Sequence, residues 1–142
     1  FMVEMVETAT ICQNADQHSL ILLDEIGRGT STFDGVSIAA AVSEYLVSNI
    51  QARTLFATHY HELTALSEKY PQIQNASMKI NDDGESLIFA YKLTSGAAEK
   101  SYGVMVAKMA GLPIAVTQKA QDWLDKFEKD ATTGEIVQLQ LF

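Results

Sequence analysis

The chain has 142 residues, a formal net charge of −8 and 47% hydrophobic residues. This length suits one domain, or one domain with an appendage, and the apolar content is ample for a packed core. Its ten basic residues are scattered, which argues against a nucleic-acid grip by this segment alone. No apolar run reaches membrane-span length, no secretory signal is visible, and the lone Cys12 fits a reducing cytoplasm. Because Phe1 is not methionine, we expect a piece of a longer polypeptide.

The first predicted element is a helix over residues 2–14. One helical face carries Met2, Met5, Val6, Ala9 and Cys12. Apolar residues at this spacing predict a face that packs in the core, with polar residues such as Thr8 opposite.

The next element is a predicted strand, Leu20-Ile21-Leu22-Leu23, followed by Asp24 and Glu25. Four consecutive branched apolar residues predict a strand buried on both faces, as in a parallel sheet covered by helices. Open α/β sheets bind ligands at the carboxyl ends of their strands. Adjacent carboxylates at that edge suit nucleoside triphosphate hydrolysis, where one binds hydrated Mg²⁺ and the next polarises the attacking water. On these residues alone, two solvated carboxylates that end a strand remain an alternative.

The continuation Gly27-Arg28-Gly29-Thr30-Ser31-Thr32-Phe33-Asp34-Gly35 is more specific. Together with residues 20–26 it resembles the Walker B segment and D-loop of the MutS mismatch-repair ATPases, which belong to the ABC-type ATPase class. A dinucleotide-binding fingerprint fits poorly, because Thr32 occupies the third glycine position and two acids stand where the tight turn should start.

This resemblance implies roles for individual residues. Asp24 would bind Mg²⁺, through water, and Glu25 would orient and deprotonate the attacking water. The loop from Arg28 to Asp34 would run along a dimer interface and couple two ATP sites. The residues that the resemblance assigns to nucleotide binding are Asp24, Arg28, Thr30, Ser31, Thr32 and Asp34.

A second helix is predicted over about residues 36–50, followed by a strand over residues 54–57. The buried stripe of the helix would consist of Val36, Ala39, Val42, Leu46 and Ile50. A strand–helix–strand order predicts a right-handed parallel crossover, which brings the carboxyl ends of both strands to one edge. We therefore expect His59, which follows the second strand, to lie near Asp24 and Glu25.

Ala57-Thr58-His59 resembles the switch loop of the same ATPase class, in which the histidine donates a hydrogen bond to the γ-phosphate. A metal site of His59, His61 and Glu62 is an alternative, although no second His/Cys cluster completes a tetrahedral set. We expect His61 to lie at the surface.

Residues 76–93 alternate apolar and polar side chains around Asp83-Gly84, which predicts an antiparallel hairpin appended to the sheet edge. A short helix over residues 101–109 and a second from Pro113 to Phe127 follow, and they predict a helix-turn-helix. Its second helix is nearly charge-balanced, so the family's use of this unit as a dimer contact fits better than DNA reading. Residues 128–135 are expected to form a polar linker.

The tail Gln138-Leu139-Gln140-Leu141-Phe142 resembles the pentapeptide by which bacterial repair proteins bind the sliding clamp. Gln138, Leu139, Leu141 and Phe142 would make the contacts. A frayed terminus, or one folded back on the helices, is the alternative.

These features predict an α/β fold, a partial P-loop NTPase of the ABC-ATPase type with parallel strands, an antiparallel hairpin and a C-terminal helix-turn-helix. Residues 1–94 would be the second half of the ATPase domain, 95–128 the dimerisation unit, and 129–142 linker and tail. No Gly-x-x-x-x-Gly-Lys-Ser/Thr loop occurs, so the phosphate cradle is missing and the segment alone should be inactive.

The family resemblance implies a cytoplasmic, nucleoid-associated bacterial parent that uses ATP and Mg²⁺. This parent would form homodimers, bind mismatched DNA through other domains, and engage a MutL-type partner. Two other classes stay open: a stand-alone interaction module, and a metal-dependent hydrolase that uses Asp24, Glu25 and His59.

Overall fold

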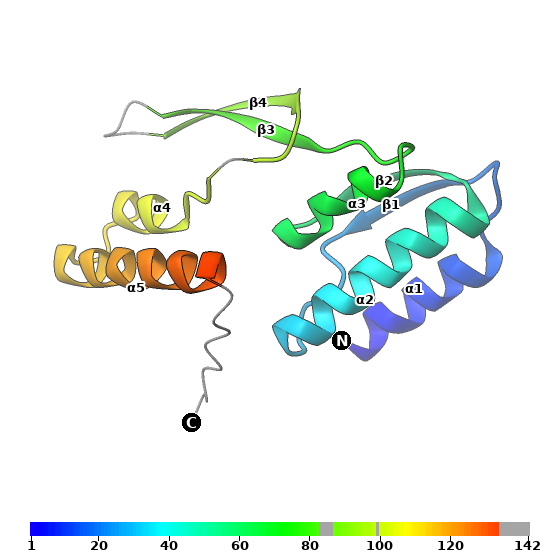
Figure 1. Cartoon of the computed structure of the whole chain (residues 1–142), viewed down its shortest axis with the longest axis horizontal. Helices are drawn as coiled ribbons and strands as arrows, with labels where there is room; N and C mark the ends of the chain where they lie inside the picture. Colours follow the sequence, from blue (N-terminus) through cyan, green and yellow to red (C-terminus); the bar gives the residue numbers. More distant parts are fainter. Residues whose placement is uncertain (83–86, 99, 134–142) are drawn as a thin grey trace. The chain divides into compact units, whose positions relative to one another are not determined.

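A computed structural model describes residues 1–82, 87–98 and 100–133 (Figure 1). Its elements in chain order are α1 (Met2–Asn14), β1 (Leu20–Asp24), α2 (Thr32–Tyr45), the π-helical segment η1 (Leu46–Ile50), β2 (Arg53–Ala57), the 3₁₀ helix η2 (His61–Ala65), α3 (Leu66–Lys69), β3 (Ala76–Asp82), β4 (Leu87–Ser95), α4 (Gly103–Met109) and α5 (Ile114–Thr133). None of the helices in these ranges has the length and apolar content that a bilayer crossing requires.

The chain divides into two compact units. The first contains residues 1–77 and 94–97, and the second contains residues 78–93 and the segment that begins at Ala98. The first unit carries α1 through α3 with the β1–β2 sheet, and it holds every predicted catalytic residue. The second carries most of the β3–β4 hairpin together with α4 and α5.

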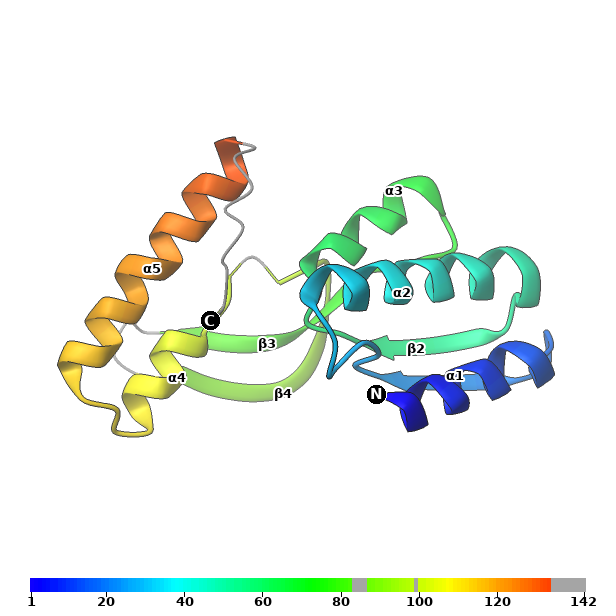
Figure 2. The same cartoon turned by 90° about the horizontal axis from the view of Figure 1, so that it is seen from below.

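The sheet of the first unit consists of β1 and β2, which pair in parallel as the crossover predicted (Figure 2). Leu20 lies opposite Arg53 at one end of the pair, and Asp24 lies opposite Ala57 at the other. The register therefore places the residues that follow Asp24 and Ala57 at the same edge.

The core of the first unit forms on one face of this sheet. Ile21 and Leu23 of β1 are buried there, together with Ile26, Leu46 and Ile50, and side chains from both α1 and α2 pack against them. The prediction that β1 is buried on both faces was wrong for the described residues. The other face of the sheet carries Leu20 and Leu22 of β1 and Leu55 of β2, each 66% exposed. Both helices supply side chains to a single cluster, which leaves the second face uncovered.

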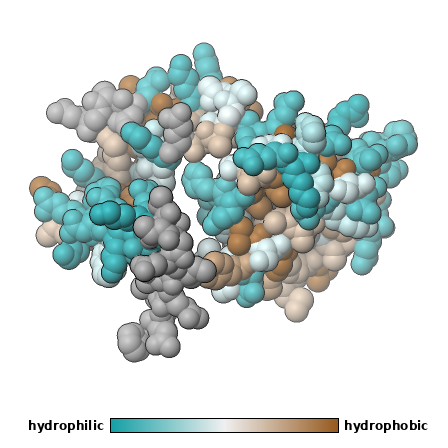
Figure 3. Space-filling model, viewed as in Figure 1, coloured by the Kyte–Doolittle hydropathy of each residue, from teal (hydrophilic) through white to brown (hydrophobic). Residues whose placement is uncertain are grey.

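Helix α1 has the predicted extent but not the predicted orientation. Met2 and Val6 are 74% and 57% exposed, whereas Thr8 is buried and Met5 and Ile11 pack on the core. Burial of Thr8 is tolerated because its hydroxyl donates to the Glu4 carbonyl one turn earlier, at 2.8 Å. The space-filling view shows apolar side chains at the surface in the region of α1 and α2 (Figure 3).

Helix α2 begins at Thr32, earlier than the predicted residue 36. The reason is a local cap: Ser31 accepts a hydrogen bond from the Asp34 backbone N–H at 3.2 Å, and its hydroxyl donates to the Asp34 carboxylate at 2.8 Å. Such a serine satisfies the free N–H groups of a first helical turn. Thr32 and Asp34 therefore belong to the helix rather than to the loop. The predicted stripe is confirmed, since all of its residues are buried or partly buried: Val36, Ala39, Val42, Leu46 and Ile50.

Strands β3 and β4 form the predicted hairpin, but not where it was expected. They make a two-stranded sheet of their own instead of extending the β1–β2 sheet. A side-chain hydrogen bond links the two strands, in which the Thr94 hydroxyl donates to the Ser77 carbonyl at 3.2 Å. The predicted turn at Asp83-Gly84 lies outside the described residues.

Helices α4 and α5 pack against each other and are joined by a short turn at residues 110–113. The predicted end of the last helix at Phe127 was wrong, because α5 continues through Glu128 to Thr133. No glycine or proline follows Pro113 until Gly134, so nothing in the sequence stops the helix earlier. The expected linker therefore cannot begin before residue 134.

Candidate functional site

The candidate site is built at the carboxyl ends of β1 and β2. Asp24 is the last residue of β1, and Glu25 continues the pairing because its backbone N–H donates to the Ala57 carbonyl at 2.8 Å. Glu25 has a φ of 52°, the left-handed conformation that non-glycine residues rarely adopt. Residues held in this region cost roughly 1–3 kcal/mol and are found where surrounding contacts fix them. The strand thus ends in a constrained carboxylate.

The Glu25 carboxylate lies between two cationic or potentially cationic side chains. One oxygen, Oε2, forms an ion pair with Arg28 and lies 3.7 Å from Nδ1 of His59. The side chain of Glu25 is 27% exposed, against 64% for Arg28 and 58% for His59. This distance confirms the expectation that Glu25 and His59 lie close together. His61, by contrast, is exposed as expected.

The loop after Glu25 is folded tightly against the start of α2. A Cβ atom on Gly27 would lie 2.7 Å from the Gly35 Cα, and Gly27 itself has a φ of +98°. A Cβ atom on Gly35 would lie 2.3 Å from the Tyr60 hydroxyl. Only glycine allows backbone segments to approach this closely. The two glycines therefore let Tyr60, which follows His59, pack under the loop.

The remaining residues of the predicted nucleotide-binding set cluster at the amino end of α2. Thr30 and Ser31 both donate hydrogen bonds to the Asp34 carboxylate, at 3.4 and 2.8 Å. Thr32 is the first residue of the helix and is exposed. In this structure Asp34 serves the helix cap, and the hydroxyl groups are turned toward it.

The sequence implies a divalent cation as cofactor. The side chains at this edge of the sheet are therefore considered as its ligands. Asp24 is an exposed carboxylate at the strand end. Mg²⁺ usually keeps several waters and binds one or two carboxylates together with substrate phosphates. Asp24 therefore fits a water-mediated Mg²⁺ contact. A closed protein-only site is not formed by the described side chains, since no three His, Cys, Asp or Glu residues among them converge as metal ligands. This weakens the alternative metal site at His59, His61 and Glu62.

Two residues at this site were missed by the sequence analysis. The Glu4 carboxylate of α1 accepts a hydrogen bond from the Gly27 backbone N–H. The Tyr60 hydroxyl donates to the Gly27 carbonyl at 3.1 Å, and Tyr60 is 7% exposed. The sequence separation of Glu4 or Tyr60 from Gly27 does not match a helical or strand period. The only available signal for Tyr60 was its position beside His59.

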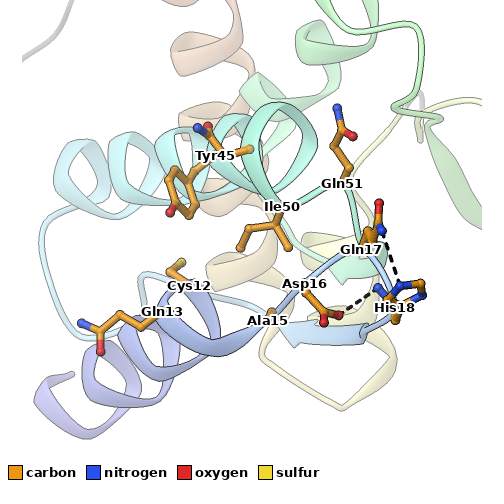
Figure 4. Close-up of a pocket in the computed structure, with 10 residues that line it drawn as sticks. Cys12, Gln13, Ala15, Asp16, Gln17, His18, Tyr45, Ile50 and Gln51 are labelled. Atoms are coloured by element: carbon orange, nitrogen blue, oxygen red, sulfur yellow. Dashed lines mark hydrogen bonds between the residues drawn. The ribbon is translucent and has the colours of Figure 1, made fainter.

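A pocket of about 620 Å³ lies elsewhere in the first unit (Figure 4). It is lined by the end of α1 and residues 15–18, which precede β1, and by Tyr45 and residues 49–51, which precede β2. It therefore lies at the amino ends of the strands, opposite the carboxylates. Partial burial raises the pKa of the Cys12 thiol there, which disfavours the reactive thiolate. We do not assign the pocket to the candidate site.

The predicted clamp-binding residues Gln138, Leu139, Leu141 and Phe142 lie outside the described residues. Their proposed role therefore stays a prediction from the sequence.

Comparison with known proteins places the chain in a family. Residues 1–128 match the family model described as MutS domain V. The chain is 53% identical over 135 residues, 95% of its length, to the DNA mismatch repair protein MutS of Bartonella quintana. It is 54% identical over 130 residues, 92% of its length, to the protein of the same name from Syntrophomonas wolfei. It spans about 15% of the length of each relative. The chain thus belongs to the MutS family, as a segment of its domain V.

Proposed function

We propose that this chain supplies the water-activating and metal-binding half of an ATP site in a MutS-type mismatch repair ATPase. The observation that carries the proposal is the convergence of Glu25 and His59, 3.7 Å apart, at the carboxyl edge of a parallel strand pair. Ligands of open α/β sheets bind at that edge. The family match and the names of the relatives support the mismatch-repair context.

The proposed chemistry assigns one role to each side chain. Mg²⁺ held through Asp24 would neutralise charge on the phosphates. Glu25 accepts the proton of the attacking water, and its constrained backbone keeps the carboxylate at the strand edge. His59 donates a hydrogen bond to the γ-phosphate from the segment that follows β2. Most of the rate enhancement in phosphoryl transfer comes from such positioning and charge stabilisation.

The proton-accepting role requires a free carboxylate oxygen. Oε2 of Glu25 is paired with Arg28 in this structure. Arg28 is 64% exposed, so its side chain has room to leave Glu25 when phosphates arrive. We propose that Arg28 then contacts the nucleotide or the partner subunit, as the D-loop resemblance implies.

The isolated chain is expected to bind Mg-ATP weakly or not at all. The reason is the missing phosphate loop, whose amides and lysine hold a triphosphate. Calorimetric titration of the 142-residue chain with Mg-ATP, alongside the longer protein, is the measurement. Micromolar affinity of the isolated chain would contradict the division of the site. Mg²⁺ retained without nucleotide would favour the metal-dependent hydrolase instead.

Other partners are proposed on the strength of the family alone. The longer protein would act as a homodimer, bind mismatched DNA through domains outside this chain, and engage a MutL-type partner. The tail would dock a sliding clamp through Gln138, Leu139, Leu141 and Phe142. Fluorescence anisotropy with a peptide of residues 130–142 and a bacterial clamp tests that contact. Equal binding by a Leu141→Ala/Phe142→Ala peptide would contradict it.

The dimer contact has support in the second unit. Among residues 114–130 of α5, Thr117 is buried, and Ala120, Leu124 and Asp130 are partly buried. An apolar stripe on α5 stays exposed beside apolar residues of α4 and the turn. The exposed residues are Val106, Met109, Leu112, Ile114, Val116, Trp123 and Phe127. Patches of this kind mark protein interaction sites.

We expect Trp123→Ala/Phe127→Ala to weaken dimerisation of the longer protein at least tenfold. Aromatic anchors dominate such interfaces, and these two rings stack with centroids 5.6 Å apart. Sedimentation equilibrium measures the effect. Gln118→Ala, an exposed polar position on the same helix, is the matched control. An unchanged dissociation constant in the double variant would remove α5 from the interface.

A further inference from the structure

The peptide groups on both sides of Gly27 are held by side chains from two other parts of the first unit. The Glu4 carboxylate of α1 accepts from the Gly27 N–H, and the Tyr60 hydroxyl donates to the Gly27 carbonyl at 3.1 Å. Gly27 lies between Glu25 and Arg28, the two residues that form the ion pair of the site. The backbone that carries the proposed base is therefore fixed from two directions.

The Tyr60 contact is enclosed. Tyr60 is 7% exposed and packs in a cluster with Ala39 and Leu63. Its hydroxyl lies so close to Gly35 that a Cβ atom there would approach it to 2.3 Å. A buried carbonyl that loses its donor pays the full cost of desolvation. The hydrogen bond to Gly27 is thus a fixed part of the packing rather than a fluctuating surface contact.

Tyr60 also touches the second strand end. Its ring lies against the imidazole of His59, with centroids 4.4 Å apart. Glu25, two residues before Gly27, holds a φ of 52°. Such a conformation persists only where neighbouring contacts impose it. The bonds to Gly27 act two residues from the constrained residue, and one of them comes from the residue next to His59.

We propose that Glu4 and Tyr60 are positioning residues for Glu25. By fixing the two peptide groups of Gly27, they hold Glu25 in its left-handed conformation with its carboxylate beside His59. Tyr60 also links the two strand ends, so that a displacement of His59 is passed to the loop that carries the base. This inference rests on the proposed function of Glu25 and His59, and it adds residues from α1 and from the segment after β2 to that site.

The test uses the longer protein with Tyr60→Phe, Glu4→Ala and Glu4→Gln. Phenylalanine keeps the ring under Gly35 and removes only the donor. Glutamine keeps an oxygen that can accept from the Gly27 N–H, whereas alanine does not. Tyr45→Phe is the matched control, since Tyr45 is 44% exposed at the far end of α2. ATP affinity, single-turnover hydrolysis and thermal unfolding are measured for each variant.

We expect Tyr60→Phe to slow single-turnover hydrolysis roughly fivefold, the effect of about one net hydrogen bond. Glu4→Ala should slow it roughly tenfold or more, because the lost acceptor is charged. Glu4→Gln should restore most of the rate. The ATP dissociation constants should stay within about twofold, and Tyr45→Phe should match the unaltered protein.

Two results would overturn the inference. One is hydrolysis at the unaltered rate in both Tyr60→Phe and Glu4→Ala. The other is a loss of rate that follows ATP affinity and unfolding temperature in parallel, with Glu4→Gln no better than Glu4→Ala, which indicates a role in folding only. Different results would contradict the proposed function itself. These are an unaltered protein that does not hydrolyse ATP, or a Glu25→Gln variant that hydrolyses it at the normal rate.

Discussion

Replacing Glu25 by glutamine in the longer protein should leave ATP binding intact and slow hydrolysis about 10²–10⁴-fold, the usual contribution of a positioned base. The amide keeps the shape of the carboxylate but cannot take the proton of the attacking water. Asp24, which would carry the Mg²⁺ contact, is unchanged in this variant. Single-turnover hydrolysis, with ATP affinity measured in parallel, gives the two quantities separately.

The matched control for this variant is Glu62→Gln. Glu62 is an exposed carboxylate in the first turn of η2, so its loss removes the same charge without touching the strand ends. We expect hydrolysis by Glu62→Gln to stay within about twofold of the unaltered protein. A rate for Glu25→Gln within a few-fold of the unaltered protein would exclude Glu25 as the base.

Gly27→Ala should destabilise the first unit by about 2–5 kcal/mol, because backbone strain and overpacking act together. Gly27 has a φ of +98°, and an added Cβ would lie 2.7 Å from the Gly35 Cα and 2.8 Å from the Gly35 carbonyl oxygen. These neighbours are backbone atoms, which cannot rotate away as a side chain would. The midpoint of denaturant unfolding of the chain measures the loss of stability.

Gly103→Ala is the contrasting control for Gly27→Ala. Gly103 is the first residue of α4, and nothing lies within 4 Å of a Cβ built there. Alanine is favoured over glycine in helices by about 0.5–1 kcal/mol, so this variant should be neutral or slightly stabilising. Equal effects of the two substitutions would show that the close approach of Gly27 to Gly35 is not needed for folding.

The arrangement of the strand ends could be predicted from the sequence because it follows from chain direction alone. Two strands joined by a helix pair in parallel, so residues after each strand meet at one edge. Glu25 and His59 do meet there. The buried stripe of α2 was also predictable, since apolar residues at its spacing fall on one face of a helix.

Other features depend on information that local patterns do not hold. The face of α1 that turns inward was mispredicted, because the buried Thr8 hydroxyl is satisfied by the Glu4 carbonyl and the exposed Met2 and Val6 look like core residues in sequence. The exposed Leu20 and Leu22 show the same limit, since an apolar run does not reveal whether both faces are covered.

The contacts of Gly27 could not be predicted for a related reason. Glu4 is 23 residues from Gly27 and Tyr60 is 33 residues from it. Only the folded backbone brings these groups together, and no repeat or motif in the sequence pairs them. The helix cap at Ser31 is the opposite case. Serine followed by an aspartate three residues later is a local signal, and the predicted helix began too late because this signal was not used.

The most direct test of the account is the structure of the longer protein, in its Glu25→Gln form, with Mg-ATP bound. The account predicts the γ-phosphate within hydrogen-bonding distance of His59, a water between Gln at position 25 and the γ-phosphorus, and Mg²⁺ linked through water to Asp24. A nucleotide bound at the amino ends of β1 and β2, or one whose γ-phosphate lies beyond reach of both His59 and position 25, would contradict it.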